Sequence, residues 1–481
     1  MGDRYDLVVL GGGASGLTAS VVAGRLGARV ALVEREEQPG GDCLFWGCVP
    51  SKALLASARL AHQMRTADRL GLEPVEPELD FARVMERVQT AIVEAGRHDR
   101  PDHLRGEGVE VVRGQGSFAG PGVVEVEGRA LRYRKAIVAT GSRPVRPPLP
   151  GLEPGHALTN ETVFDLRELP GRLAIVGGGA TGVELGQAFA RLGSAVTIVE
   201  ASQRLLPTEE PEAGRLIAES LIDDGVAVRT GAGADAVAPA QDGTGALLLG
   251  SERVAYDRLI LAIGREPATE GLGLERVGVQ LTEEGWVKVD ALLRTTAAHI
   301  YAAGDAVGQL IYTHVAGYHG LLAALNALFH ARRRADYTAI PRVVFSDPEL
   351  AAVGLIEQEA AERLGRPPLV FRHDYADSDR AITAAETRGF AKLVADRRGR
   401  LLGATIAAPA AGESIAELAR LVRDGAKVAD VLAVVHAYPT FSEGPARAAE
   451  GWWSHRVLNP RGRRLLRPLL RVLSLLDRPR G

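Results

Sequence analysis

The sequence predicts an α/β protein built on doubly wound parallel sheets, because one pattern of strand, glycine-rich turn and helix occurs twice. The first copy is LVVLGGGASGLTASVVAGRLGARVALVERE, and the second is LAIVGGGATGVELGQAFARLGSAVTIVEAS. Each begins with a short run of Val, Leu and Ile, which is typical of a buried parallel strand. An amphipathic helix follows and ends at Gly27 or Gly193, and a second apolar strand comes next. Both segments are therefore predicted to be βαβ units.

The turn of each copy has the spacing G-x-G-x-x-G. In such a turn the first glycine permits the bend, the second lets the backbone approach a pyrophosphate, and the third lets helix pack on strand. The phosphates then lie at a helix N-terminus, where free N–H groups and the helix dipole favour an anion. A single copy would also suit plain strand-to-helix packing. The predicted contacts are Gly11, Gly13, Ala14, Ser15 and Gly16 in the first copy, and Gly177, Gly179, Ala180, Thr181 and Gly182 in the second.

An acidic residue closes each unit, because Glu34 and Glu200 both stand 23 positions after the first glycine of their turns. A carboxylate at this place accepts hydrogen bonds from an adenosine ribose. Two copies with matching spacing imply two dinucleotides bound by one chain. A carboxylate also repels a 2′-phosphate, and Arg204 alone is thin support for NADP, so the sequence favours NAD.

Composition restricts the class of protein. The 481 residues are enough for roughly three domains, and 46% apolar with 24% charged residues is typical of a globular protein. A net charge of −3 argues against general nucleic-acid binding. No apolar run approaches the ~18 residues of a membrane span, and the N-terminus lacks the layout of a signal peptide. We therefore expect a cytoplasmic enzyme.

The chain has only two cysteines, Cys43 and Cys48, in the segment GGDCLFWGCVPSK. A structural disulfide framework would use more cysteines, and a zinc site would need further Cys or His ligands nearby. Two interpretations remain, a pair of buried apolar cysteines or a redox pair.

The cysteine segment is similar to the motif GGxCxxxGCxPSK of the pyridine nucleotide–disulfide oxidoreductases, which include dihydrolipoamide dehydrogenase, glutathione reductase and mercuric reductase. The resemblance extends from about Tyr5 to about Glu450. In YAAGDAVG it implies that Asp305 holds the ribityl chain of a flavin. Three further segments resemble family motifs: KAIVATGSRP at 135–144 and LILAIGREPAT at 259–269, which leave the flavin and nicotinamide domains, and FSDPELAAVGL at 345–355, which opens the dimerisation domain.

The resemblance also implies an order of domains, and the Pro- and Gly-rich linkers SRPVRPPLPGLEPG and REPATEGLGLERVG agree with it. The predicted fold is α/β, with two doubly wound, Rossmann-like dinucleotide-binding domains and a C-terminal α+β dimerisation domain. It implies a homodimer whose active site is shared between subunits. The expected parts are an FAD-binding domain at 1–150, an NAD(P)-binding domain at 151–270, a return to the FAD domain at 271–337, the dimerisation domain at 338–455, and a basic amphipathic tail at 456–481.

The family implies that electrons pass from the nicotinamide through FAD to the Cys43–Cys48 disulfide, and from the dithiol to a substrate. Cys48 would lie against the flavin as the thiolate, and Cys43 would exchange with the substrate. The pair begins a helix, whose dipole lowers a thiol pKa. By resemblance Lys52 pairs with Glu184 beside the flavin, although a solvated lysine and an ordinary polar glutamate remain alternatives. Further implied contacts are Gly41, Lys52, Gly116, Thr140, Gly141 and His314 for FAD, and Glu184, Gly264 and Arg265 for NAD.

One segment departs from the family pattern. Disulfide-reducing members carry a motif like HxHPTxSE, whose second histidine is the acid/base, held by a glutamate five residues later. Here the segment is HAYPTFSE, so Tyr438 stands at the histidine position and Glu443 keeps its spacing. A tyrosine with an ordinary pKa near ~10 cannot accept a proton at pH 7. His436 is either a substitute base or a structural interface residue.

Two families of acceptor remain open. A tyrosine at this position resembles mercuric reductase, in which metal-ion reduction has less need of a base. The chain nevertheless lacks that enzyme's C-terminal cysteine pair. The predicted function is reduction of a disulfide or a metal ion. The alternatives are an NADH oxidase or quinone reductase that uses the cysteines little, and a flavin-binding sensor or assembly partner with negligible turnover.

The C-terminal segment NPRGRRLLRPLLRVLSLLDRPRG has seven arginines and one aspartate. Leu465, Leu469, Leu473 and Leu476 form a helical stripe, although Pro468 disfavours one long helix. The segment is compatible with a helix on an anionic membrane, with a helix packed on its own dimer, or with a frayed tail.

Overall fold

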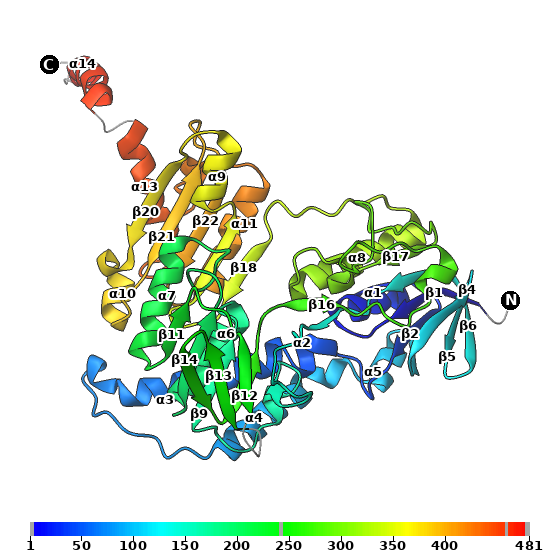
Figure 1. Cartoon of the computed structure of the whole chain (residues 1–481). Helices are drawn as coiled ribbons and strands as arrows, with labels where there is room; N and C mark the ends of the chain where they lie inside the picture. The colour runs from blue at the N-terminus through cyan, green and yellow to red at the C-terminus, as the bar shows by residue number, and fades with distance from the viewer. Residues whose placement is uncertain (1–3, 240–243, 457–459, 477–481) are drawn as a thin grey trace. The chain divides into compact units, whose positions relative to one another are not determined.

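The computed structural model describes residues 4–239, 244–456 and 460–476, which form two compact units (Figure 1). The described residues of the first unit are 4–64, 76–203, 224–239 and 244–336, and those of the second are 65–75, 204–223, 337–456 and 460–476.

The first unit contains a seven-stranded sheet with the order β3-β2-β1-β6-β5-β4, and β17 pairs with β6. β1 pairs in parallel with β2 and β6, β2 with β3, and β6 with β17, whereas β4 and β5 continue the sheet as antiparallel strands. β1 and β2 are the two apolar strands that the sequence predicts for the first βαβ unit. Their bounds are β1 (Arg4–Leu10), β2 (Val30–Glu34), β3 (Val109–Arg113), β4 (Gly116–Gly120), β5 (Val123–Val126), β6 (Arg129–Val138) and β17 (Ile300–Ala302).

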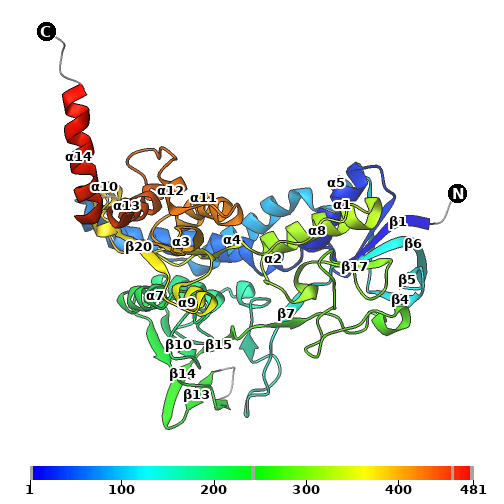
Figure 2. The same ribbon diagram turned by 90° about the horizontal axis from the view of Figure 1, so that it is seen from above.

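Side chains of β1 alternate between two cores, because successive residues of a strand point to opposite faces. Leu7 and Val9 pack with α1 (Ala14–Arg25) and α8 (Thr313–Phe329), which lie side by side in Figures 1 and 2. Val8 and Leu10 belong to the core on the other face. The sheet is thus buried on both sides, and the loops at its strand ends are held in place.

The second βαβ unit builds a five-stranded parallel sheet with the order β11-β10-β9-β15-β8. Its glycine turn connects β9 to α6 (Ala180–Arg191). The strands are β8 (Ala157–Leu158), β9 (Arg172–Val176), β10 (Ala195–Glu200), β11 (Ala227–Thr230) and β15 (Arg258–Leu261), with two smaller antiparallel sheets of β12 (Ala236–Pro239), β13 (Gly245–Leu249) and β14 (Glu252–Tyr256), and of β7 (Ser142–Pro144) and β16 (Arg265–Pro267).

The cysteine segment forms two consecutive helices, α2 (Gly41–Phe45) and α3 (Cys48–Arg65). α3 is the helix that the sequence predicts to begin at CVPSK. The remaining long helix of this part is α4 (Phe81–Ala95), followed by α5 (Pro101–Gly106).

The second unit is an antiparallel sheet, with the order β18-β19-β22-β21-β20, covered by helices. Its core includes Phe371, Tyr375 and Trp452. These units confirm the predicted mixed α/β fold. The elements are β18 (Pro341–Val344), β19 (Leu350–Gly354), β20 (Leu369–Asp374), β21 (Phe390–Ala395), β22 (Leu401–Ala407), α9 (Glu357–Leu364), α10 (Asp379–Ala384), α11 (Ala411–Arg423), α12 (Val428–Val431) and α13 (Gly444–Arg456).

Helix α7 (Pro211–Asp223) belongs to the second unit, although it lies between strands of the first along the chain. A buried ion cluster explains this, because the Nζ atom of Lys392 on β21 lies 3.1 Å from Glu210 and 3.0 Å from Glu212. The domain boundaries expected from the sequence remain a prediction.

The C-terminal segment forms α14 (Pro460–Leu476), which continues through Pro468 without a break. Leu469 and Leu473 of the predicted stripe are exposed, whereas the side chains of Leu465 and Leu476 lie outside the described part of the structure. Within the described residues, no helix combines the length and apolar character of a membrane span.

Candidate active site

The two cysteines lie where α2 meets α3. Cys43 is half-buried within α2, and Cys48 is the exposed first residue of α3. Both are free thiols in this structure. A hydrogen bond joins the two side chains and places their shared proton on Cys43, which raises the pKa of Cys43 well above its usual range. The same hydrogen bond lowers the pKa of Cys48 to about 6 against the opposing effect of burial.

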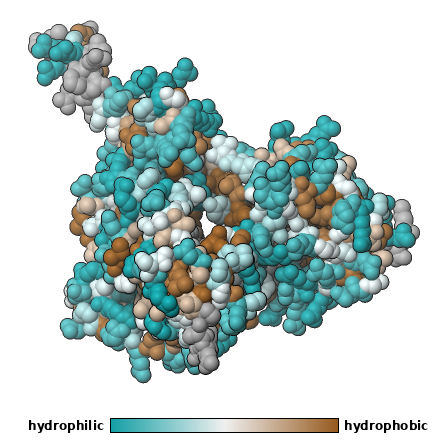
Figure 3. All heavy atoms as spheres, in the orientation of Figure 1, coloured by the Kyte–Doolittle hydropathy of each residue, from teal (hydrophilic) through white to brown (hydrophobic). Residues whose placement is uncertain are grey.

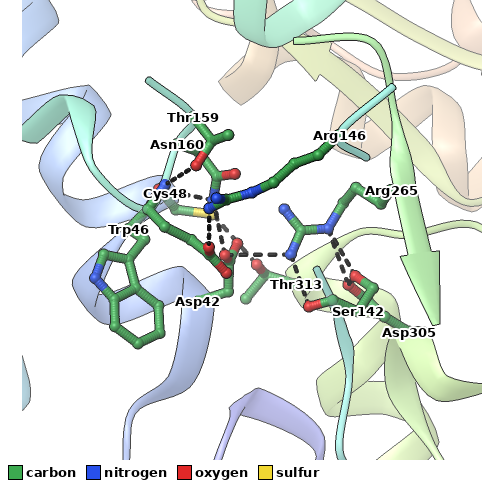
Figure 4. A network of polar contacts seen from close by, with 11 residues as sticks. Asp42, Trp46, Cys48, Ser142, Arg146, Thr159, Asn160, Arg265, Asp305 and Thr313 are labelled. Carbon is green, nitrogen blue, oxygen red and sulfur yellow. Dashed lines mark hydrogen bonds and ion pairs between the residues drawn. The ribbon is translucent and has the colours of Figure 1, made fainter. Parts of the chain in front are cut away.

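A second polar group supports the Cys48 thiolate. The Sγ atom of Cys48 lies 3.2 Å from the Oγ1 atom of Thr313, the first residue of α8 (Figure 4). The hydrogen bond from Thr313 and the charge of Lys52 both lower the pKa of Cys48. These contacts favour Cys48 over Cys43 as the thiolate of the pair, and its position against the flavin remains a prediction.

Lys52 and Glu184 form the ion pair that the sequence predicts. The Nζ atom of Lys52 donates to Glu184 over 2.7 Å, which joins α3 to α6. The glutamate side chain is 6% exposed and the lysine side chain is 36% exposed. Since Glu184 is nearly buried, the pair holds the redox helix at a fixed place on the second βαβ unit.

A second connection between the same helices was not predicted. Asp224 accepts hydrogen bonds from Arg191 at 2.9 Å and from Gln187 at 2.8 Å, both on α6, and lies 3.2 Å from the Nδ1 atom of His62 on α3. Burial would raise the pKa of Asp224, but the hydrogen bond from His62 and the charge of Arg191 lower it. Asp224 and Arg191 are far apart in the sequence and share no motif, so their contact can be seen only in the folded chain.

The first glycine turn has the geometry that a dinucleotide site requires. Gly11 has a φ of +100°, and a Cβ atom there would lie 2.3 Å from the carbonyl oxygen of Ala139. A Cβ atom on Gly16 would lie 1.8 Å from the carbonyl oxygen of Gly11, so α1 packs directly against the turn. One carboxylate oxygen of Glu34 accepts the N–H of Gly12 over 2.7 Å. Glu34 therefore orders the turn itself.

The second glycine turn repeats the first. Gly177 has a φ of +114°, and a Cβ atom on Gly182 would lie 1.9 Å from its carbonyl oxygen. Glu200 accepts the N–H groups of Gly178 and Ser202, each over 2.7 Å. Burial would raise the pKa of Glu200, but these backbone hydrogen bonds lower it.

Two residues that lie between the glycine turns in the sequence, Gly41 and Thr140, fit an FAD molecule. The hydroxyl of Thr140 is buried and has no hydrogen-bond partner within the described chain, so it is available to a ligand. Gly41 has a φ of +61°, and a Cβ atom there would lie 2.6 Å from the Cα atom of Gly13. A side chain at position 41 would therefore fill the space beside the N-terminus of α1. Residues with these properties would hold the pyrophosphate and the chain that leads to the flavin ring.

Other predicted contacts lie in varied surroundings. Gly116 packs in β4, where a Cβ atom would lie 2.9 Å from the side chain of Val33, so its small size serves the sheet. Gly141 and Gly264 have positive φ angles of +73° and +128° with open space around them. His314 is exposed and stacks on Tyr312.

The structure places Arg265 against Asp305 of the flavin motif and against Asp42 of α2 (Figure 4). Its guanidinium donates to the Oγ atom of Ser142 over 2.6 Å and lies 3.2 Å from Asp42 and 3.8 Å from Asp305. Burial raises the pKa of Asp305, while the hydrogen bond from Ser142 opposes the rise. In this structure the partners of the Arg265 guanidinium are Ser142, Asp42 and Asp305, and the nicotinamide contact that the resemblance implies for Arg265 remains a prediction.

Asp42, next to Cys43, completes this network and was missed by the sequence analysis. Asn160 donates to Asp42 over 2.8 Å and to the carbonyl oxygen of Trp46 over 3.2 Å. These bonds fix both ends of α2. The only sequence signal was a carboxylate beside a predicted redox cysteine.

The motif HAYPTFSE lies in the second unit. The hydroxyl of Tyr438 donates to Asp379 over 2.5 Å, and this bond raises the pKa of Tyr438. The Nε2 atom of His436 lies 2.9 Å from Glu417, and its Nδ1 atom lies 3.1 Å from the carbonyl oxygen of Val434. Both ring nitrogens of His436 are thus occupied within its own subunit. Glu443 is bound by Arg447 over 2.6 Å.

Comparison with known proteins decides the family. The sequence profile of the pyridine nucleotide-disulphide oxidoreductases matches residues 5–320, and the profile of their dimerisation domain matches residues 340–449. The chain belongs to this family. As a pyridine nucleotide-disulphide oxidoreductase it is an FAD-dependent enzyme that uses a pyridine nucleotide and forms a homodimer. Bound FAD would supply the hydride acceptance from the nicotinamide and the two-electron transfer to the cysteine pair.

Relatives with different substrates are similarly close to this oxidoreductase. It is 38% identical to the dihydrolipoyl dehydrogenase of Thermus scotoductus, covering 93% of this chain and 97% of the relative. It is also 38% identical to the mercuric reductase of Streptomyces lividans, covering 94% and 96%. Among solved structures, LpdA from Mycobacterium tuberculosis matches with a TM-score of 0.85, 29% identity and coverage of 94% and 99%. The Cu(II) complex of the HOCl-induced flavoprotein disulfide reductase RclA from Escherichia coli matches with a TM-score of 0.84, 29% identity and coverage of 93% and 99%.

Proposed function

We propose that the chain is an NADH-dependent reductase whose Cys43–Cys48 pair reduces a thiophilic metal ion such as Cu(II) or Hg(II). One observation carries this proposal: the position of the family's acid/base histidine is taken by Tyr438, whereas the Sγ atom of Cys48 keeps a polar partner 3.2 Å away in Thr313. The mercuric reductase of S. lividans and the Cu(II) complex of RclA support this substrate class, because both are similar to this chain.

Proton handling distinguishes a metal ion from a disulfide. Reduction of a disulfide substrate releases two thiols, and each leaving sulfur needs a proton. A metal ion needs none: two Cu(II) ions take one electron each, the two sulfurs form the Cys43–Cys48 bond, and the proton of Cys43 leaves to solvent. The chain is suited to the second reaction, because the bond to Asp379 keeps the proton on Tyr438 at neutral pH.

His436 is not proposed as a substitute base. Its ring bridges Glu417 and a backbone carbonyl, and its side chain is only 8% exposed. A histidine with both nitrogens engaged in one subunit is a structural residue in this arrangement.

NADH is the proposed nicotinamide. The Glu200 carboxylate at the second turn disfavours a 2′-phosphate, because two like charges would meet there. Arg204 does not offset it, since its guanidinium donates to the carbonyl oxygens of Leu206, Pro207 and Glu209.

The proposal is tested by NADH-driven turnover of the purified flavoprotein under argon with Cu(II), Hg(II), lipoamide and glutathione disulfide. The wild type should reduce a metal ion and show little disulfide reductase activity, and Cys48→Ser should abolish metal reduction. Tyr438→His should gain disulfide reductase activity, with Tyr438→Phe as the matched control that gains none. Full activity toward quinone or oxygen in Cys43→Ser and Cys48→Ser, with no metal reduction in the wild type, would favour an oxidase or quinone reductase instead.

A further inference from the structure

The C-terminal helix α14 (Pro460–Leu476, red in Figure 2) has no role in the electron transfer proposed above. Its described side chains, which are Arg464 and those of residues 466–473, are all exposed. This exposure includes large apolar residues as well as charged ones. Figure 3 accordingly shows both hydrophilic and hydrophobic atoms in the part of α14 that it colours.

The apolar side chains of α14 gather on one side of the helix, which we call the apolar face. At about 100° per residue they fall within an arc of about 160°. They are between 38% and 62% exposed, far more than the buried Trp452 of α13 at 9%. The members of the apolar face are Leu466, Leu469, Leu470, Val472 and Leu473.

Three arginines form the opposite, cationic face, because Arg464, Arg467 and Arg471 fall within about 60° of one another, on the far side of the helix axis. The sequence 460–476 holds five arginines and no aspartate or glutamate. The helix is therefore amphipathic and carries charge of a single sign.

The charge of α14 decides what covers its apolar face. A second copy packed through its apolar face would cover the leucines but would supply no negative charge to the cationic face of either helix. An anionic lipid surface offers both apolar chains for the leucines and negative headgroups for the arginines. The helix is about 26 Å long and has arginines along its length, so it suits a position in the membrane surface and not across it.

We propose that α14 docks on an anionic lipid bilayer, lying parallel to its surface with the apolar face inserted among the acyl chains and the cationic face against the headgroups. This inference does not depend on the identity of the electron acceptor.

Vesicle co-sedimentation of the full-length holoenzyme tests the proposal. The wild type should sediment with vesicles of phosphatidylcholine and phosphatidylglycerol but not with pure phosphatidylcholine. The triple variant Leu466→Ser, Leu470→Ser, Leu473→Ser should lose this binding. Replacing Arg464, Arg467 and Arg471 by Gln should weaken it on the order of a hundredfold, at about fivefold per arginine.

A matched control replaces three leucines of similar exposure elsewhere, Leu26, Leu70 and Leu72, by Ser. This control should keep vesicle binding, and all variants should keep NADH-driven turnover in solution. Binding that is equal for both leucine variants, or that does not depend on phosphatidylglycerol, would overturn the proposal. So would conversion of the dimer to a monomer by the α14 variant without any vesicle binding by the wild type, because a second copy would then cover the helix.

Discussion

Replacing Thr313 by valine should raise the pKa of Cys48 by about one unit. Valine has nearly the shape of threonine but has no hydroxyl, so it removes the group that lies 3.2 Å from the Cys48 sulfur. A hydrogen bond to a charged group contributes about 1.5 to 3 kcal/mol, and the partial exposure of this site places the effect at the lower end. Since one pKa unit corresponds to about 1.4 kcal/mol, the pKa should rise from about 6 to roughly 7.

The assay is the pH dependence of iodoacetamide alkylation in a Cys43→Ser background. The chain has only two cysteines, so Cys48 is then its single thiol. Because this background removes the hydrogen bond from Cys43 that lowers the pKa of Cys48 most, the reference is Cys43→Ser alone, and Thr313→Val should raise the alkylation midpoint by about one pH unit above that reference. Thr313→Ser keeps a hydroxyl and should leave the midpoint unchanged. An identical midpoint in the valine variant would refute the role assigned to Thr313.

Three further perturbations follow from the same contacts. Folding lowers the pKa of Cys48 from about 9 to about 6, so the stability that its thiolate contributes is present above pH 9 and is lost as pH falls through 6. The Tm of the reduced protein relative to Cys48→Ser should therefore increase as pH rises from 6 to 9, and a constant Tm difference would contradict the lowered pKa. Arg191→Leu leaves the nearly buried Asp224 without the arginine that pairs with it, so it should lower the free energy of unfolding in urea by about 3 to 5 kcal/mol. The double variant Arg191→Leu, Asp224→Leu should recover most of this loss, and an equal loss in both variants would count against the ion pair. Glu200→Ala should lower the ratio of kcat/KM for NADH to that for NADPH, and an unchanged ratio would show that the carboxylate does not select the nicotinamide. The same variant should lower the free energy of unfolding by about 1 kcal/mol, because two backbone N–H groups lose their acceptor.

The sequence was sufficient for the features that lie within one local pattern. Strand, glycine turn and helix follow one another in each βαβ unit, so their periodicity and the carboxylates at Glu34 and Glu200 can be read directly. The pairing of Lys52 with Glu184 was predicted from the family motif and is present in the fold.

The contacts that escaped prediction join segments far apart in the chain. Asp42, Ser142, Arg265 and Asp305 form one network, but they come from an α-helix, two short strands and a 3-10 helix that are far apart in the chain. No periodicity relates such residues, because their distance is set by the packing of whole sheets. The orientation of His436 is a similar case, since it depends on Glu417 of α11.

The Lys52–Glu184 pair and the bridge through Asp224 make the position of α3 depend on α6. The cysteine helix follows the first βαβ unit in the chain, yet Glu184, which holds it, lies on α6 of the second unit, and Asp224 lies directly after α7. A fragment that ends before β9 would keep both cysteines and lose both anchors. Chimeras that exchange one half of this enzyme with a relative should therefore function only when α3 and α6 are taken from the same parent. Although the two units repeat one pattern, neither can therefore be exchanged without the other.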